Sequence, residues 1–307
     1  MDTHCWTWRR ARHTLRHGLD DVRQRFTRPA GAWVDPPAWR VATAFARRPP
    51  GFLIIGAQRA ATTSLYRLLT SHPGVRPALR KEVHYFDFQY AKGRSWYLAH
   101  FPLRSFSGLT GEASPYYMVH PLAPERVKRM NPRMKLIAIL RDPVDRALSH
   151  YHREVRLGFE PLTFVEAVDA EPERLAADSH RLLEPPHYYS HNHHHYSYRD
   201  RGRYGHHLAR WLEHFPREQL HVIRMEAMFE DPGDIIGKTL AFLGLPPVDV
   251  ERLHLPHANR APPYDVPDPT LRARLKRHFE ADQAELEGLL QSRRLLQSRH
   301  TRLPSQD

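Results

Sequence analysis

The first residues with a clear chemical signature form a short turn of small, basic and hydroxyl-bearing side chains. The turn reads GAQRAATTS and begins at Gly56. Compared with the nucleotide-binding pattern G-x-x-x-x-G-K-[ST], it keeps Gly56 and Thr63, whereas Ala61 and Thr62 replace the second glycine and the lysine. The missing lysine disfavours an ordinary P-loop NTPase. A turn that leads into a helix N-terminus still offers free N–H groups to an anion, and Arg59 would add a positive charge.

A second basic and hydroxyl-bearing pair follows another apolar segment. Arg141 comes directly after the run KLIAIL, and Asp142 and Pro143 have the residue types of a helix cap and of a first helical position. Ser149 then lies about two turns into the expected helix. Because Arg141 ends a strand and Ser149 lies on the following helix, we expect both to face one crevice at the carboxyl end of that strand.

Apolar strands that alternate with amphipathic helices organise the chain around these residues. The expected strands are 52–55, 135–140 and 220–223. One expected helix ends at 72–74 and another begins at 143. Further helices are expected over 204–215, 235–243 and 271–296. This alternation implies βαβ units, so the predicted fold class is α/β, with a central, mainly parallel sheet and helices on both faces.

Composition and charge limit the kinds of partner. The 307 residues include 46 Lys and Arg against 34 Asp and Glu, a net charge of +12, and the pI is about 10.0. This excess predicts a polyanionic partner, such as phosphate, sulfate, nucleic acid or anionic lipid. The apolar fraction of 41% excludes a wholly disordered chain, and no apolar run is long enough for a membrane-spanning helix. The single Cys5 excludes an intrachain disulfide.

We divide the chain into a basic, partly helical N-terminal extension (1–50), an α/β domain (51–292) and a basic C-terminal tail (293–307). Apolar residues of the extension recur at helical spacing, at Trp8, Leu15, Leu19, Val22 and Phe26. Arginines lie around this face, so the helix either contacts an anionic membrane surface or packs its apolar face on the domain. No apolar signal-peptide core follows the basic N-terminus, and the expected location is therefore the cytoplasm.

Four motifs occur in a fixed order along the chain. They are GAQRAATTSL at 56–65, KEVHYFD at 81–87, GEASPY at 111–116 and LRDPVDRALS at 140–149. This series resembles sulfotransferases that use 3′-phosphoadenosine 5′-phosphosulfate (PAPS), above all the heparan-sulfate 3-O- and N-sulfotransferase branch and its bacterial relatives. The resemblance implies a P-loop-NTPase-like three-layer fold, PAPS as donor and 3′-phosphoadenosine 5′-phosphate (PAP) as product. It implies a hydroxyl or amine acceptor, such as a carbohydrate, glycolipid or natural product, and neither a metal nor nucleic acid.

The resemblance also implies which residues bind the donor. The first loop would hold the 5′-phosphosulfate through Arg59, Ala60, Ala61, Thr62, Thr63 and Ser64. Arg141 and Ser149 would hold the 3′-phosphate. Tyr204 begins the helix beside the same cleft, and Arg260 would reach the 3′-phosphate from a later loop.

By the same resemblance, the second motif carries the catalytic groups. Glu82 would act as the base that takes the acceptor's proton during in-line transfer, with His84 and Asp87 as its active-site partners. Arg59 would stabilise the charge that develops on the leaving phosphate, because a guanidinium is a poor proton donor. The residues alone leave open a simpler interpretation of 81–87, a strand with alternating exposed charges.

A tract dense in histidine and tyrosine, HYYSHNHHHYSY, spans 187–198. We interpret it as a loop on the acceptor side, since these side chains combine flat faces with hydrogen-bonding tips. A solvated surface loop is the alternative, and no metal site is expected because no cysteine or paired acid lies nearby. One departure concerns the acceptor: Ala113 follows Glu112 where the heparan branch usually has lysine, so heparan-like acceptor specificity does not follow from the resemblance.

Two other functions compete with sulfuryl transfer. A small-molecule kinase that uses ATP and Mg²⁺ needs the loop lysine, which is absent. A nucleic-acid or anionic-membrane binding module is suggested only by the net charge and the N-terminal helix, and the sequence has no zinc-finger or RNP-like motif.

Overall fold

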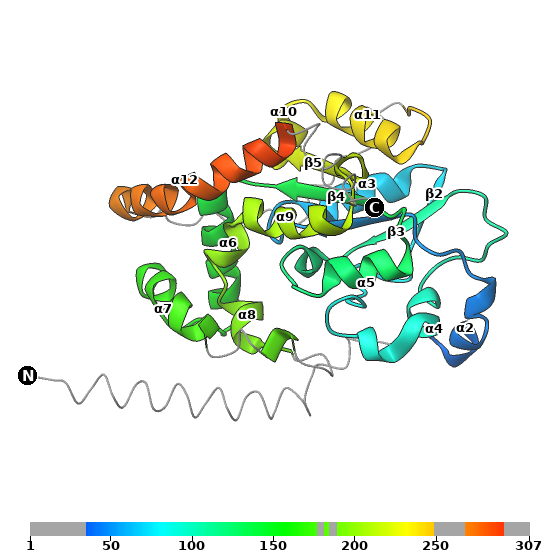
Figure 1. The fold of residues 1–307 in the computed structure, drawn as a ribbon, viewed down its shortest axis with the longest axis horizontal. Helices are drawn as coiled ribbons and strands as arrows, with labels where there is room; N and C mark the ends of the chain where they lie inside the picture. Colours follow the sequence, from blue (N-terminus) through cyan, green and yellow to red (C-terminus); the bar gives the residue numbers. More distant parts are fainter. Residues whose placement is uncertain (1–34, 177–180, 184–188, 249–267, 292–307) are drawn as a thin grey trace, which may run out of the picture.

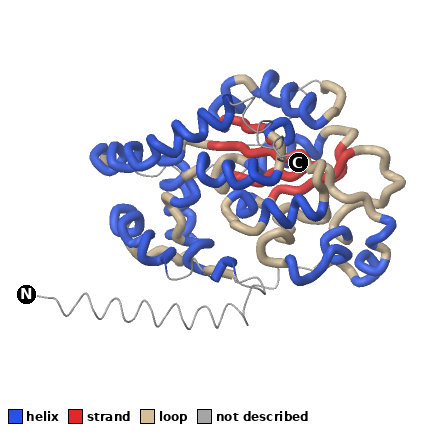
Figure 2. Tube along the Cα trace, in the orientation of Figure 1, coloured by secondary structure: helices blue, strands red, loops and turns tan. Residues whose placement is uncertain are grey.

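A five-stranded parallel sheet forms the centre of the computed structural model (Figures 1 and 2), which describes residues 35–176, 181–183, 189–248 and 268–291. The strand order is β2-β3-β1-β4-β5, and every neighbouring pair is parallel. The strands are β1 (Phe52–Gly56), β2 (Val75–Pro77), β3 (Leu109–Ala113), β4 (Lys135–Leu140) and β5 (Leu220–Arg224). The carboxyl ends of β3, β1 and β4 therefore lie next to one another at one edge of the sheet.

The central strand β1 is buried on both faces. Phe52 and Ile54 pack into one apolar cluster, and Leu53 and Ile55 pack into another. This alternation follows from the two-residue period of a strand. It explains why the sequence shows a continuous apolar run here, as expected where helices cover both faces of a parallel sheet.

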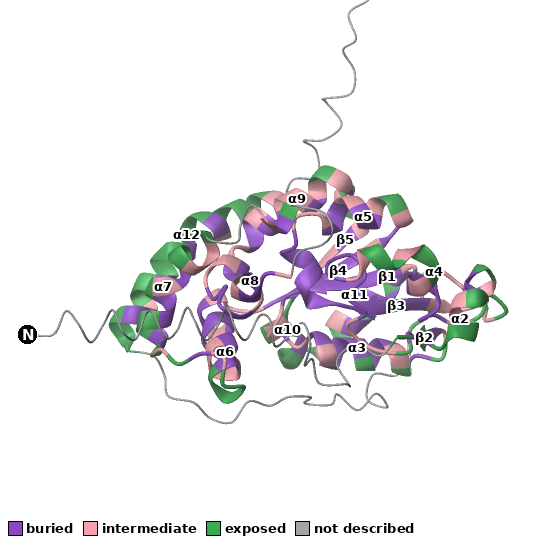
Figure 3. Cartoon of the chain, turned by 90° about the horizontal axis from the view of Figure 1, so that it is seen from below, coloured by how far each residue is buried: buried purple, intermediate pink, exposed green. Residues whose placement is uncertain are grey.

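Helices cover both faces of the sheet, and Figure 3 shows α5 and α9 on one side with α3 and α10 on the other. The first cluster joins the sheet to α3 (Thr62–Ser71), α10 (Met225–Glu230) and α11 (Pro232–Leu243). The second cluster joins it to α4 (Gly93–Leu98), α5 (Ala123–Met130), α9 (Tyr204–His214) and α12 (Pro269–Gln291).

A further block of helices packs beside the sheet, on the left in Figure 1. It has its own apolar cluster with the first half of α12 and consists of α6 (Pro143–Arg156), α7 (Phe164–Ala176) and α8 (His191–His195). Within the described residues the remaining α-helix is α2 (Ala38–Ala42), and the short 3₁₀ helices are η1 (Ala44–Ala46), η2 (Tyr90–Lys92), η3 (Pro115–Met118), η4 (Arg181–Leu183), η5 (Asp200–Gly202) and η6 (Arg217–Gln219).

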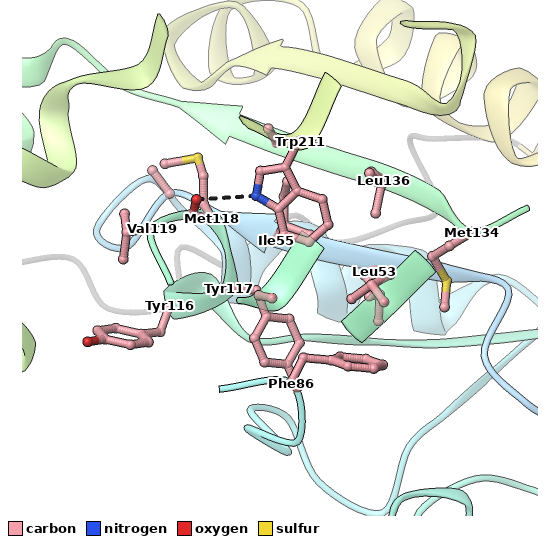
Figure 4. Packing of buried hydrophobic residues seen from close by; sticks show 14 of the residues in the cluster. Leu53, Ile55, Phe86, Tyr116, Tyr117, Met118, Val119, Met134, Leu136 and Trp211 are labelled. Atoms are coloured by element: carbon pink, nitrogen blue, oxygen red, sulfur yellow. Dashed lines mark hydrogen bonds between the residues drawn. The ribbon is translucent and has the colours of Figure 1, made fainter. Parts of the chain in front are cut away.

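Trp211 ties α9 to the segment that follows β3. Its indole is fully buried, and its Nε1–H donates to the carbonyl of Met118 at 3.2 Å, the dashed line in Figure 4. Tyr117 lies below β1 in the same view and meets the ring of Phe86 edge-on at 5.4 Å between centroids. This packing fixes η3 against the sheet, and η3 in turn supports the site described below.

Several elements agree with the sequence prediction. Strand β4 spans 135–140 as expected, and Asp142 caps α6 by accepting from the N–H groups of Val144 (3.0 Å) and Asp145 (2.9 Å). The expected C-terminal helix is α12 up to Gln291, and its Asp282 accepts from two N–H groups at the start of α9. Strands β2 and β3 were not predicted. The N-terminal helix, Arg260 and the basic tail lie outside the described residues.

In the part of the chain that the structure describes, no helix combines the length and the apolar character that crossing a bilayer requires.

Gly111 in β3 gives a test of this packing. A Cβ atom there would lie 2.4 Å from the carbonyl oxygen of Phe52 and 2.6 Å from its ring, so we expect Gly111→Ala to destabilise the fold by about 2 kcal/mol or more. Gly237 in α11 is the matched control, because nothing lies within 4 Å of its Cβ position. Gly237→Ala should leave stability unchanged or raise it by about 1 kcal/mol. Urea unfolding measures both, and equal effects would contradict the close approach of β1 and β3.

Candidate active site

The turn after β1 has the geometry of an anion-binding loop. Arg59 and Ala61 both adopt left-handed backbone conformations, with φ of 71° and 61°. The helix α3 then starts at Thr62 without a side-chain cap. Because the first N–H groups of a helix have no partner within it, this terminus presents donors and a positive dipole end to an anion.

Three predicted donor-binding segments converge at the carboxyl edge of the sheet. Strand β4 pairs with β1, so Arg141, which follows β4, lies beside the turn that follows β1. Ser149 is buried on α6, and its hydroxyl accepts from Arg59 Nε at 3.0 Å. Tyr204 at the start of α9 donates its hydroxyl to the Arg141 carbonyl at 3.0 Å. The Arg141 guanidinium is half-buried and makes no hydrogen bond or ion pair with any residue that the structure describes.

The other predicted loop residues lie on the same terminus. Thr62 and Ser64 are buried in the first turn of α3, Thr63 is half-buried, and Ala60 is buried in the preceding turn. The predicted donor residues outside 249–267 therefore gather at one place.

Residues 81–87 form an irregular loop, so the alternative interpretation of an alternating strand is wrong. Glu82 and His84 both have positive φ values, 61° and 54°. The His84 imidazole lies between two carboxylates: its Nδ1 is 2.7 Å from Asp87 Oδ2, and its Nε2 is 3.6 Å from Glu82 Oε2. The Lys81 ammonium is paired with the other oxygen of Glu82. The side chain of Glu82 remains 45% exposed, whereas Asp87 is fully buried.

These contacts fix the charge state of the acid–histidine cluster, defined here as Glu82, His84 and Asp87. Burial alone would lower the pKa of the His84 imidazole, but the Asp87 and Glu82 carboxylates raise it to about 10. Burial would raise the pKa of the Glu82 carboxyl, yet the contacts with His84 and Lys81 hold it below its usual value. At neutral pH the cluster therefore contains an imidazolium and an ionised Glu82.

The segment after β3 holds this loop in place. The backbone N–H groups of four successive residues, 82–85, donate in chain order to Ala113 O (3.0 Å), Glu112 Oε2 (3.2 Å), Ser114 Oγ (3.2 Å) and the Tyr117 hydroxyl (2.8 Å). The motif GEASPYY is thus the scaffold of the cluster. These bonds compensate for the left-handed conformations at Glu82 and His84.

Glu112 is the buried centre of the scaffold, and the sequence did not predict its role. Its carboxylate also accepts from the hydroxyls of Ser114 (2.6 Å), Tyr117 (2.7 Å) and Tyr97 (3.1 Å). Burial raises the pKa of Glu112, although these donors favour the charged form. Its place among the small and aromatic residues of the motif GEASPY was the available signal.

The histidine- and tyrosine-rich tract is partly helical and buried, so the alternative of a solvated surface loop is wrong for its described part, 189–198. Ser190 caps α8 by accepting from the N–H of His193 at 2.9 Å. His193 and His195 are buried. A serine directly before a run of residues that can form a helix was the signal for this helix.

The tract adjoins the acid–histidine cluster through aromatic rings. Phe88 stacks on His84 with centroids 5.3 Å apart. On its other sides Phe88 lies 4.7 Å from Tyr116, 5.0 Å from Tyr189 and 5.6 Å from His194. We call Phe88, Tyr116, Tyr189 and His194 the aromatic wall. Within the described residues, no group of three or more His, Cys, Asp or Glu side chains is arranged to hold a metal ion.

Comparisons with known proteins identify the family of this chain and its relatives. Residues 49–258 match the sequence model of the family described as "Sulfotransferase domain". The chain is 33% identical over 199 residues to human heparan sulfate glucosamine 3-O-sulfotransferase 6, covering 65% of this chain and 53% of that protein. It is 32% identical over 214 residues to human bifunctional heparan sulfate N-deacetylase/N-sulfotransferase 3, covering 65% of this chain and 23% of that protein. The chain thus spans about half the length of the first relative and less of the second.

A solved structure extends the likeness to the fold. The crystal structure of a sulfotransferase from Alicyclobacillus acidocaldarius matches with a TM-score of 0.64 and 30% identity, covering 79% of this chain and 96% of that chain. Together with the parallel sheet and its two helical layers, this match confirms the predicted P-loop-like α/β fold.

The charge state of His84 predicts how stability depends on pH. A group whose pKa is raised on folding adds stability below its unfolded pKa, near 6.5, and loses it as the pH rises through its folded pKa, about 10. Over this range His84 should lower the free energy of unfolding by up to about 1.4 kcal/mol per pH unit. Asp87→Asn removes one stabilising carboxylate, so its urea-unfolding stability should fall less steeply with pH. Asp234→Asn, at an exposed ion pair on α11, should keep the wild-type slope. Equal slopes in all three proteins would contradict a protonated His84.

Proposed function

The chain belongs to the sulfotransferase domain family, and we propose on this basis that it moves a sulfuryl group from PAPS to a hydroxyl or amine acceptor. The observation that carries the proposal is the contact between Arg59 and Ser149, at 3.0 Å. It joins the anion-binding turn after β1 to the helix after β4. A bisphosphorylated nucleotide needs two such anchor points within one crevice, at the carboxyl edge of a parallel sheet.

The donor would be held by charge at both ends. The turn with Arg59 and the N-terminus of α3 would bind the 5′-phosphosulfate. Arg141 and Ser149 would bind the 3′-phosphate, and the Arg141 guanidinium has no partner among the described residues that it would have to leave. Arg59 would exchange its bond to Ser149 for the donor, which frees the Ser149 hydroxyl for the 3′-phosphate.

In the transfer step the acceptor oxygen or nitrogen forms a bond to sulfur while the bond from sulfur to the 5′-phosphate oxygen breaks. The electron pair of the broken bond stays on the phosphate, and the acceptor's proton passes to Glu82. Partial exposure of Glu82 leaves its carboxylate within reach of an acceptor. Its low pKa makes it a weak base, so the proton would leave late, when the new bond to sulfur has largely formed. His84 and Asp87 would orient the carboxylate, and Arg59 would stabilise the phosphate charge.

The acceptor would lie along the aromatic wall. Phe88 of this wall stacks on His84, and its half-buried members Tyr189 and His194 would offer flat faces to a sugar or an aromatic ring. Ala113 supplies no charge where the heparan branch usually has lysine, which favours a less anionic carbohydrate or a small molecule over a polysulfated chain. Cytoplasmic location and membrane contact through the N-terminal helix remain predictions from the sequence.

Ligand-dependent thermal stability tests the proposed function. PAP at about 100 times its Kd should raise the melting temperature by about 5 °C, whereas ADP with Mg²⁺ or duplex DNA should not. Arg141→Ala should raise the Kd for PAP about ten- to hundredfold, since it removes charge-assisted hydrogen bonds. Arg133→Ala is the matched control, because Arg133 is exposed at the opposite end of β4. Selective stabilisation by ADP with Mg²⁺ would instead indicate a kinase, and by DNA a binding module.

Replacement of the base separates binding from chemistry. Glu82→Gln should bind PAP with a Kd within about threefold of the wild type. Its turnover should fall by about 10²–10⁴, because the glutamine amide cannot accept the acceptor's proton. Turnover is followed as PAP release from PAPS with heparan sulfate oligosaccharides and with p-nitrophenol as acceptor probes. Glu125→Gln, on the exposed face of α5, should turn over like the wild type. A Glu82→Gln enzyme with full turnover would remove Glu82 from the role of base.

A further inference from the structure

Arg201 is a buried guanidinium that joins the anion-binding turn to the aromatic wall. The residue is 2% exposed and lies in η5, just before α9. Its Nη1 donates to the side-chain oxygen of Gln58, the residue before Arg59 in the turn. Its guanidinium carbon lies 4.8 Å from the centroid of the Tyr116 ring, a cation–π contact. One side chain thus contacts two of the four sequence motifs.

The same guanidinium also holds the end of α8. Its Nε donates to Ser197 Oγ at 2.7 Å, and its Nη2 donates to the carbonyls of His193 (2.8 Å) and His194 (2.9 Å). The ring of His193 in turn meets the Tyr116 hydroxyl at 2.6 Å. These donors diverge from one planar fork, a pattern that a lysine ammonium does not reproduce.

The charge of Arg201 is not neutralised by an adjacent carboxylate. No Asp or Glu of the described ranges forms an ion pair with it, and Glu154 and Asp200 act on it only through longer-range attraction. A buried charge is costly unless it is compensated. Because the Arg201 guanidinium contacts Gln58 of the turn, a phosphosulfate bound in that turn would supply negative charge close to it.

We propose that Arg201 is a positioning residue for the donor: it sets the conformation of the turn through Gln58, fixes the aromatic wall relative to that turn, and adds positive charge behind the phosphosulfate. This inference rests on the proposed function. It differs from a role in stability alone because the effect on the conformation of the turn passes through one side chain, that of Gln58, and can be measured as coupling between the two residues.

A double-mutant cycle between Arg201 and Gln58 tests the inference. The variants are Arg201→Lys, which keeps the charge but loses the fork, Gln58→Met, which keeps the size but loses the acceptor, and their combination. We expect each single change to raise the Kd for PAP, measured by calorimetry, about tenfold. The double variant should bind about as weakly as either single one, a coupling of about tenfold.

Arg47→Lys is the matched control. Arg47 is as buried as Arg201 and donates to the carbonyl of Phe101 at 3.0 Å, at a site that contacts neither the turn nor α8. This variant should lose stability without a change in the Kd for PAP. A loss of PAP affinity equal to that of Arg201→Lys would mean that the effect is general destabilisation and would overturn the inference.

The outcomes separate this inference from the proposed function. If the wild type binds PAP and the effects of Arg201→Lys and Gln58→Met are additive or absent, only the role of Arg201 fails. If the wild type does not bind PAP, the proposed function fails and this inference fails with it. If Arg201→Lys does not fold, Gln58→Met alone decides, since an unchanged Kd for PAP would exclude action through Gln58.

Discussion

Hydrogen bonds to one buried side chain, that of Glu112, and to its neighbours Ser114 and Tyr117 hold the loop 81–87 against the sheet. Glu112 is the fourth residue of β3 and pairs in register with Leu53 of β1, so its position is set by the centre of the fold. From there it accepts from the Val83 N–H and from three hydroxyls. Hydrogen bonds to a charged group contribute about 1.5–3 kcal/mol each. This anchoring transfers the rigidity of the sheet to His84 and its neighbouring carboxylates.

The anchoring is needed because the backbone of the turn after β1 and of the loop 81–87 is strained. Among the described residues, the non-glycine positions with positive φ are Arg59, Ala61, Glu82 and His84. All four lie in the turn after β1 or in the loop 81–87. Each such conformation costs about 1–3 kcal/mol and persists only where the surroundings enforce it. Strand β1 and helix α3 enforce the first pair, and the GEASPYY scaffold enforces the second. Strain and scaffold together place the guanidinium of Arg59 and the carboxylate of Glu82 in conformations that free loops would rarely adopt.

The sequence predicted the parts of the site that depend on local chemistry. The strand β4, the Asp142 cap and the start of α6 follow from neighbouring residues, so they were predicted closely. The short strand β3 was missed because LTGEA is neither strongly apolar nor alternating. The burial of the His/Tyr tract and the contacts of Arg201 were missed for a different reason. They depend on partners such as Gln58, 143 residues away in the chain, and no local pattern encodes such distances.

The proposed site uses permanently charged arginines for donor binding and titratable side chains for proton transfer. In the proposed complex the donor contacts Arg59 and Arg141, and Arg201 supports the turn from behind Gln58; the guanidinium charges of these three residues do not change over the physiological pH range. Proton movement would be confined to the acid–histidine cluster, where Glu82 and His84 shift each other's pKa. An arginine at position 59 fits this division, because it would hold the leaving phosphate by charge without giving it a proton. Donor affinity and proton transfer would then respond to pH separately, since they depend on different side chains.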